Sequence, residues 1–194
     1  MKRNPEWART LLWSYARNMA TTAKRTSIYA DVKATQSVTD VTLASYNDAL
    51  EALFVIKDID AWTPQIRSKT AIRSAKKHIF IDPSIGLAAL GISPEYFNND
   101  LDLFGHVLEN MVLRDLLVYA ENHNARVLHY TDDMGLEADA VYQMEDGRYA
   151  LSCLSERLKA MHWDYISVNS INVTFPSFSA NAVHSQVYPL FENK

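Results

Sequence analysis

Residues 101–122 constrain the fold of this chain more than any other stretch. Apolar side chains recur there at helical spacing around much of the circumference, at Phe104, Val107, Leu108, Met111, Val112, Leu116 and Leu117. A helix of this kind has to be covered by other elements on more than one side. We therefore expect a long, largely apolar helix over residues 101–122.

Three strand-like runs follow this helix, at residues 126–130, 137–144 and 148–154. The second and third runs are separated by Glu145-Asp146-Gly147. A three-residue hairpin loop there places Met144 opposite Arg148, and the same register places Asp139 opposite Cys153. A one-residue difference in the loop would move that partner to Leu154. The pattern predicts a helix followed by a three-stranded meander.

The first part of the chain reads as three helices and two strands. One helix begins after Asn4-Pro5, a second is capped by Thr26 and runs to Ala34, and a third covers residues 40–53. Strands are expected at 54–59 and 78–81, with Asp82-Pro83 closing the unit. This order is typical of a winged helix-turn-helix. We therefore predict an α+β protein with a winged-helix-like unit at 1–83 and a small α/β unit at 84–194.

Charge divides the chain in the same way. The formal net charge is −4 over 194 residues, but residues 1–77 are basic (+6) and residues 78–194 are acidic (−10). No apolar run is long enough to cross a membrane, and the N-terminus has no apolar signal-peptide core, so no membrane partner is expected. The single Cys153 suits a reducing compartment and predicts a cytoplasmic location.

Two carboxylates occupy positions where burial is costly. Glu109 lies on the apolar helix, and Asp139 lies between two alanines in the second run. The order of a helix glutamate, a strand aspartate and a neighbouring strand with Glu-x-Lys resembles a PD-(D/E)xK (restriction-endonuclease-like) core. There the carboxylates hold Mg²⁺ and the lysine positions water. Alternatively, Glu109 bends to solvent and Asp139 caps a turn or points out of the sheet.

Four ordered stretches carry a wider resemblance: "SVTDVTLASYNDALEALFVIKDIDAW", "RSKTAIRSAKKHIFIDPSIGLAALG", "LFGHVLENMVLRDLL" and "HYTDDMGLEADAVY". From residue 4 to residue 151 the chain resembles the C-terminal region of a prokaryotic AAA-type ATPase family, catalogued as domain of unknown function 4143. The resemblance implies a winged-helix segment and a nuclease-like fold. In that family an ATPase module precedes them.

The chain departs from that family after residue 151. Where the family's third strand carries Glu-x-Lys, this chain has Cys153-Leu154-Ser155, which motivates the hypothesis of a reading-frame change near codon 152 that the coding DNA would test. The five glycines cannot form a Walker A loop, so ATP hydrolysis is not expected. With the nuclease motif incomplete, we predict no nuclease activity, no cofactor and at most weak Mg²⁺ binding at Glu109 and Asp139.

A basic stretch supports a second interpretation. Its members are Arg67, Lys69, Arg73, Lys76 and Lys77, which could contact DNA phosphates without reading sequence. The polar face of the third helix is acidic, which opposes this contact. We therefore predict a non-catalytic accessory region that docks a protein partner, such as the ATPase module, or associates with a second copy. Nucleic-acid binding is the alternative.

Overall fold

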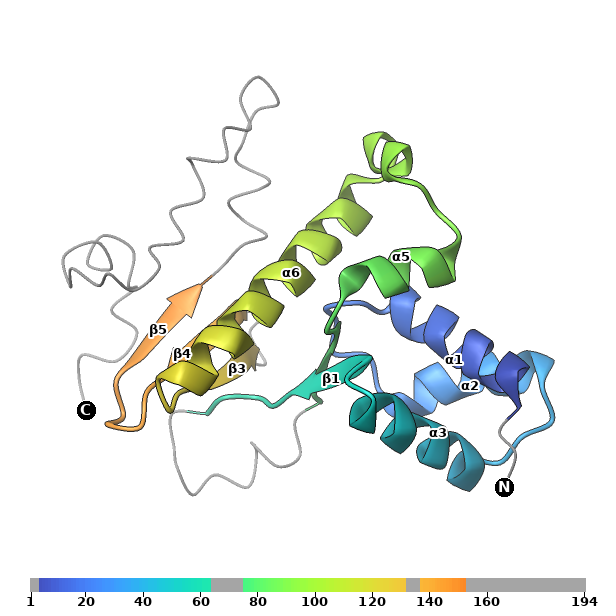
Figure 1. The fold of residues 1–194 in the computed structure, drawn as a ribbon, viewed down its shortest axis with the longest axis horizontal. Coiled ribbons are helices and arrows are strands. Elements are labelled where there is room, and N and C mark those ends of the chain that lie inside the picture. The colour runs from blue at the N-terminus through green and yellow to red at the C-terminus, as the bar shows by residue number, and fades with distance from the viewer. Residues whose placement is uncertain (1–3, 64–74, 132–136, 153–194) are drawn as a thin grey trace.

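The computed structural model describes residues 4–63, 75–131 and 137–152, and it shows a mixed α+β fold (Figure 1). The helices are α1 (Pro5–Arg17), α2 (Arg25–Thr35), α3 (Asp40–Ala52), α5 (Pro83–Leu90) and α6 (Leu101–Asn122), with a short 3₁₀ helix η1 (Pro94–Asn98). The strands are β1 (Ile56–Ile59), β2 (Lys77–Phe80), β3 (Arg126–Thr131), β4 (Glu137–Gln143) and β5 (Tyr149–Ser152). None of the helices in these ranges is long and apolar enough to span a membrane.

Two small antiparallel sheets organise the strands. β1 pairs with β2, with Ile56 opposite Phe80, and the second sheet has the order β3-β4-β5. The chain after β1 also reaches the second sheet, because Ala61 forms a parallel bridge with His129. The Trp62 N–H donates to the His129 carbonyl at 2.6 Å. The segment that leaves β1 therefore runs beside β3 and links the two sheets.

The expected helices of the first part are present, with one difference at a cap and one additional helix. The Asn4 side chain caps α1 by accepting from the Glu6 N–H at 2.9 Å. The prediction that Thr26 caps the second helix was wrong, because α2 begins at Arg25. Helix α5 was not predicted. Asp82 caps it and Pro83 is its first residue, so the proline that ends the strand also begins a helix.

The second part follows the sequence pattern closely. Helix α6 covers the expected residues, and the Met144 N–H donates to the Arg148 carbonyl at 2.8 Å, as the three-residue loop requires. The paired residues extend to Ala140 opposite Ser152. The next pair in this register would join Asp139 to Cys153, but Cys153 lies outside the described residues.

One amide side chain fastens α6 to the first hairpin. The Asn110 Nδ2 donates to the Phe80 carbonyl at 2.7 Å, and its Oδ1 accepts from the Phe80 N–H at 2.7 Å. Both residues are buried. Around this contact, Val107 of α6 joins the core of the helical part, while Leu113 packs against the second sheet. Helix α6 thus contributes to the cores of both parts. The elements on either side of the predicted boundary at residue 83 therefore pack together.

A polar network crosses the helical part and ends at the hairpin. His78 lies opposite Asp58 and contacts it through Nδ1 at 2.6 Å, while its Nε2 lies 2.8 Å from the Ala23 carbonyl. The members linked in order by hydrogen bonds or ion pairs are Tyr15, Asn47, Glu51, Arg25, Asp58 and His78. Burial raises the pKa of Asp58, but His78 and Arg25 outweigh that effect and hold it below its ordinary value. The Asp58 carboxylate therefore stays ionised and holds Arg25 and His78 in place.

Helix α3 ends in a strained conformation. Phe54, two residues past its end, has a φ of 55°, in the left-handed region where helices usually place glycine. The neighbouring Leu53 has a φ of −87°. The Phe54 side chain is 75% exposed, so it gains little from burial in return for its backbone strain.

Replacing this residue tests the strain directly. Phe54→Gly should raise the free energy of unfolding by about 0.5–1 kcal/mol, because glycine adopts positive φ without the Cβ penalty. Leu53→Gly is the matched control and should lower it by a similar amount, since its φ is ordinary. Urea unfolding would measure both. A loss of stability in Phe54→Gly equal to that in the control would contradict the account.

Candidate functional site

Three charged side chains from distant parts of the chain meet in the interior. Lys77 on β2 binds Glu109 on α6 through its Nζ, and the same Nζ lies 3.8 Å from Asp139 Oδ1 on β4. All three residues are buried. The two carboxylates singled out in the sequence are therefore brought to one lysine, and neither is at the protein surface.

A change of register in β4 accounts for the position of Asp139. Leu128 pairs with Val141, whereas Tyr130 pairs with Ala138, so β4 contains one residue more than β3 over this interval. Such a bulge interrupts the alternation of side chains between the two faces of a strand. Ala138, Asp139, Ala140 and Val141 are all buried. The extra residue allows Asp139 to reach Lys77 while Ala140 packs in the core beside α6.

The cluster holds more negative than positive charge. With every group ionised, two carboxylates face one ammonium group and the net charge is −1. Burial raises the pKa of Glu109 to about 7; the charge of Lys77 opposes this shift, and that of Asp139 adds to it. Uptake of one proton by Glu109 would leave a neutral Lys77–Asp139 pair. The arrangement can therefore bind or release a proton near neutral pH.

His129 lies close to the cluster. Its Nε2 is 3.0 Å from the Ala75 carbonyl, so Nε2 carries the hydrogen, and the buried Nδ1 has no hydrogen-bond partner within the described part of the chain. Burial, followed by the charge of Lys77, lowers the pKa of His129 to about 4. The ring is therefore neutral at pH 7, and it adds no charge to the cluster.

The described residues do not fit a Mg²⁺ site well. Mg²⁺ requires several oxygen ligands in octahedral geometry. Here both carboxylates face the ammonium group of Lys77, which would repel a cation at the same place. Within residues 4–63, 75–131 and 137–152, no three His, Cys, Asp or Glu side chains are grouped to hold a metal ion. The two carboxylates are thus placed to pair with the ammonium group of Lys77 and to share a proton, instead of coordinating a cation.

The basic stretch of the sequence is divided by the structure. Lys76 is half-exposed and pairs with Asp60 at 2.9 Å, while Lys77 is buried in the cluster. Arg67, Lys69 and Arg73 lie outside the described residues. Of the five cations expected to contact phosphates, the two that are described are both ion-paired.

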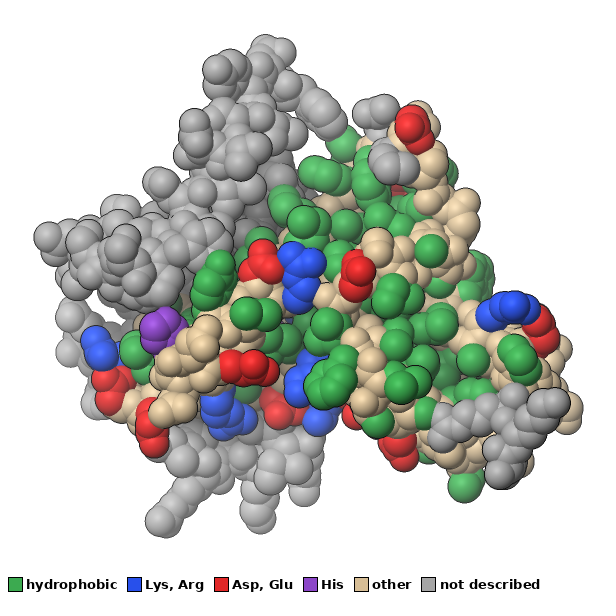
Figure 2. All heavy atoms as spheres, viewed as in Figure 1, with side chains coloured by type: hydrophobic (Ala, Val, Ile, Leu, Met, Phe, Trp, Pro, Cys, Tyr) green, Lys and Arg blue, Asp and Glu red, His purple; other side chains and the backbone are tan. Residues whose placement is uncertain are grey.

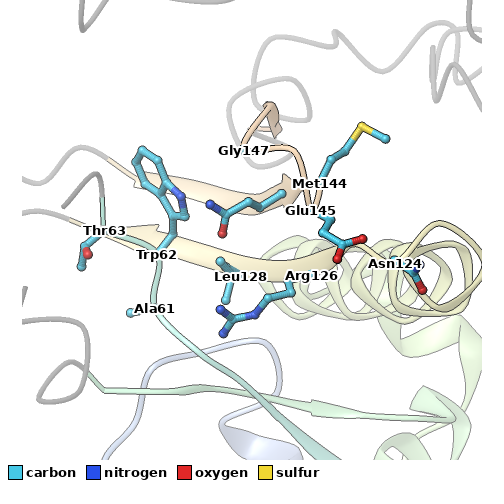
Figure 3. A pocket seen from close by; sticks show the side chains of 10 residues that line it. Ala61, Trp62, Thr63, Asn124, Arg126, Leu128, Met144, Glu145 and Gly147 are labelled. Carbon is cyan, nitrogen blue, oxygen red and sulfur yellow. The ribbon is translucent and has the colours of Figure 1, made fainter. Parts of the chain in front are cut away.

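An open cavity of about 770 Å³ lies elsewhere, against the second sheet. Figure 3 shows that its wall comes from residues 61–63, from the start of β3 and from the β4–β5 turn. Trp62 contributes an aromatic side chain, and Arg126 and Glu145 contribute opposite charges. None of the three cluster residues lines it. The cavity and the charge cluster are therefore separate features.

Sequence reasoning missed that Lys77 of β2 contacts α6 and that Asn110 of α6 contacts β2. Lys77 belongs to a run of lysines and arginines that looks like a solvated face. It differs from Lys76 in one respect, since it adjoins the predicted strand at residues 78–81. An isolated lysine at the start of a buried strand needs a carboxylate partner, and Glu109 was the nearest candidate on an apolar helix.

Comparison with known proteins gives a family match over the first part of the chain. Residues 1–96 match the model of a family described as a domain of unknown function (DUF8612). No curated protein and no solved structure matches the chain. The matched range contains Lys77, while Glu109 and Asp139 lie beyond it. The resemblance to the C-terminal region of AAA-type ATPases stays a prediction.

The cluster predicts a specific titration. In ¹³C NMR the carboxyl carbon of Glu109, identified by its absence in Glu109→Gln, should titrate with a midpoint near 7. Lys77→Met should move the midpoint higher, because the ammonium charge that favours the carboxylate is removed. A Glu109 midpoint below 5 would contradict the account.

The same shift has a consequence for stability. Because the folded-state pKa is raised, the folded protein binds this proton between about pH 4.5 and 7 and the unfolded chain does not. The contribution of Glu109 to the free energy of unfolding is fully present below pH 4.5. It is lost as the pH rises through 7. Glu109→Gln removes this dependence.

Proposed function

We propose that this chain is a non-catalytic accessory region that docks a protein partner, as the C-terminal winged-helix and nuclease-like region of an AAA-type ATPase. The winged-helix interpretation is supported by the order of three helices and an antiparallel hairpin, α1-α2-α3-β1-β2. The nuclease-like interpretation is supported by the order α6-β3-β4-β5 and by the meeting of Glu109 and Asp139. The partner is the ATPase module or a protein that regulates it.

The observation that carries this proposal is the position of α5. Every residue of this helix except Ser84 is apolar or glycine, a composition typical of a fully buried helix. Its inner side packs closely, because a Cβ on Gly86 would lie 3.2 Å from the Phe80 ring. Its outer side is exposed at Ala88, and Ile85 and Leu87 stay half-buried although they pack against the core of the helical part.

The surroundings of α5 extend this apolar surface. Figure 2 shows hydrophobic side chains gathered over α5, over α1 and along the N-terminal half of α6, on the face turned towards the viewer. Contiguous apolar surface of this kind marks interaction sites in soluble proteins. In contrast, the buried charged groups Lys77, Glu109 and Asp139 are grouped with one another in the interior. The chain thus presents a surface for docking more readily than a site for chemistry.

A two-part binding measurement tests this function. The purified chain should bind the separately purified ATPase module of an AAA-type ATPase whose C-terminal region it resembles, with an affinity in the micromolar range or tighter. Ala88→Lys, on the exposed side of α5, should weaken the complex by about tenfold or more, because it buries an unpaired charge. Val41→Lys, at a residue that is 82% exposed on α3, is the matched control. Isothermal titration calorimetry would measure all three.

The second part uses duplex DNA of about twenty base pairs at low and physiological salt. No saturable binding is expected. Salt-dependent binding that disappears on charge reversal of Arg67, Lys69 and Arg73, together with no binding to the ATPase module, would contradict the proposal. That result would favour the nucleic-acid alternative.

A further inference from the structure

A stripe of apolar side chains runs along the solvent side of α6. Its members occupy positions 101, 104, 108, 111 and 118, which share one side of a helix because the spacings are three, four, three and seven residues. Leu101 is 47% exposed, Met111 is 40% exposed and Val118 is 57% exposed. Phe104 and Leu108 are half-buried. We call these five residues the α6 stripe.

From residue 101 to residue 111 the α6 stripe has the spacing by which helices pair, and Asp115 occupies the next position of that spacing, before Val118. Apolar positions that alternate by three and four residues form the contact line of two helices packed side by side. The stripe extends over about 26 Å, at about 1.5 Å per residue, and it is one helix wide. This shape fits a second helix along α6. Met111, near its middle, has an unbranched side chain that adapts to different partners.

The segment that carries the stripe is acidic. Between residues 82 and 125 the charged side chains other than buried Glu109 are six acids and one arginine, a formal balance of −5. The acids are Asp82, Glu95, Asp100, Asp102, Asp115 and Glu121, all of them exposed or partly exposed. The arginine, Arg114, donates to Asp115 at 2.9 and 2.7 Å and is thereby neutralised. An apolar line with an acidic border selects a partner with basic residues beside its apolar face.

We propose that the α6 stripe binds a cationic amphipathic helix of a partner protein, with apolar residues at the same three-and-four spacing and lysine or arginine on its flanks. This inference rests on the proposed docking function and gives the chemistry of the partner. The acidic border disfavours an anionic membrane surface and nucleic acid. It also disfavours a second copy, since two-fold pairing of α6 with itself would bring the acidic borders together.

A synthetic peptide provides the probe. It has eighteen leucine and lysine residues arranged so that the leucines form one helical face, and it carries a fluorescent label. We expect the chain to bind it with a dissociation constant in the micromolar range, and to bind about tenfold more weakly when salt rises from 50 to 500 mM. Two control peptides, one of the same composition in scrambled order and one with glutamate for lysine, should bind at least about tenfold more weakly. Fluorescence anisotropy measures these affinities.

Variants of the chain locate the site. Met111→Lys and Val118→Lys should each weaken peptide binding about tenfold or more, because they place a charge in the apolar contact. Val41→Lys is again the control and should leave it unchanged. Glu95→Gln with Asp102→Asn removes two exposed negative charges and leaves the apolar residues of the stripe in place. This double variant should reduce both the affinity and its dependence on salt.

Several outcomes would overturn the inference. One is that the leucine-lysine peptide does not bind. Another is that the scrambled or glutamate peptide binds as tightly as the leucine-lysine peptide. A third is that Val41→Lys weakens peptide binding as much as Met111→Lys does. Sedimentation velocity could show that the chain self-associates and that Met111→Lys abolishes this self-association. That result would mean that the stripe binds a second copy and not the proposed partner helix. Binding to the ATPase module without binding to the peptide would remove this inference and leave the proposed function intact. Binding to the peptide without binding to the module would contradict the proposed function and leave this inference intact.

Discussion

Two neighbouring residues of α6 hold the first hairpin against the second sheet. Glu109 binds the ammonium group of Lys77 at the start of β2, and Asn110 bonds both the N–H and the carbonyl of Phe80 at the end of the same strand. An asparagine that satisfies two buried backbone groups is costly to replace, because the donor and the acceptor are both left unpaired. This junction sets where α6 lies, and α6 in turn carries the core contacts of the second sheet.

The junction also explains why the conspicuous carboxylates are a poor basis for predicting chemistry. A buried lysine needs an anionic partner, and the two carboxylates at Lys77 are committed to that structural role. Asp139 approaches the same ammonium group through the bulge in β4 and leaves the cluster one negative charge in excess. That excess is removed most simply by a proton on Glu109, whose pKa is raised to about 7. Surface features, namely α5 and the α6 stripe, then become the better guide to function.

The sequence predicts those elements whose local signals agree with each other. Helix α6 has apolar periodicity over twenty-two residues, and the β4–β5 register follows from Glu145-Asp146-Gly147. Helix α5 escaped notice because it has almost no polar side, so its eight residues show no periodicity. The partners of Lys77 depend on contacts between residues 32 and 62 positions apart, which no local pattern reveals. The bulge that directs Asp139 is set by pairing with β3 and is equally invisible along the chain.

The contact of Asn110 with Phe80 is expected to make the two parts of the protein one cooperative unit. Native-state hydrogen exchange in the wild type and in Asn110→Ala tests it. The account predicts that amides of α3 and amides of β4, far apart on either side of the junction, lose protection by the same amount, about 2–4 kcal/mol. Unchanged protection in α3 with a loss confined to α6 and β3-β4-β5 would show two independently folding parts and contradict it.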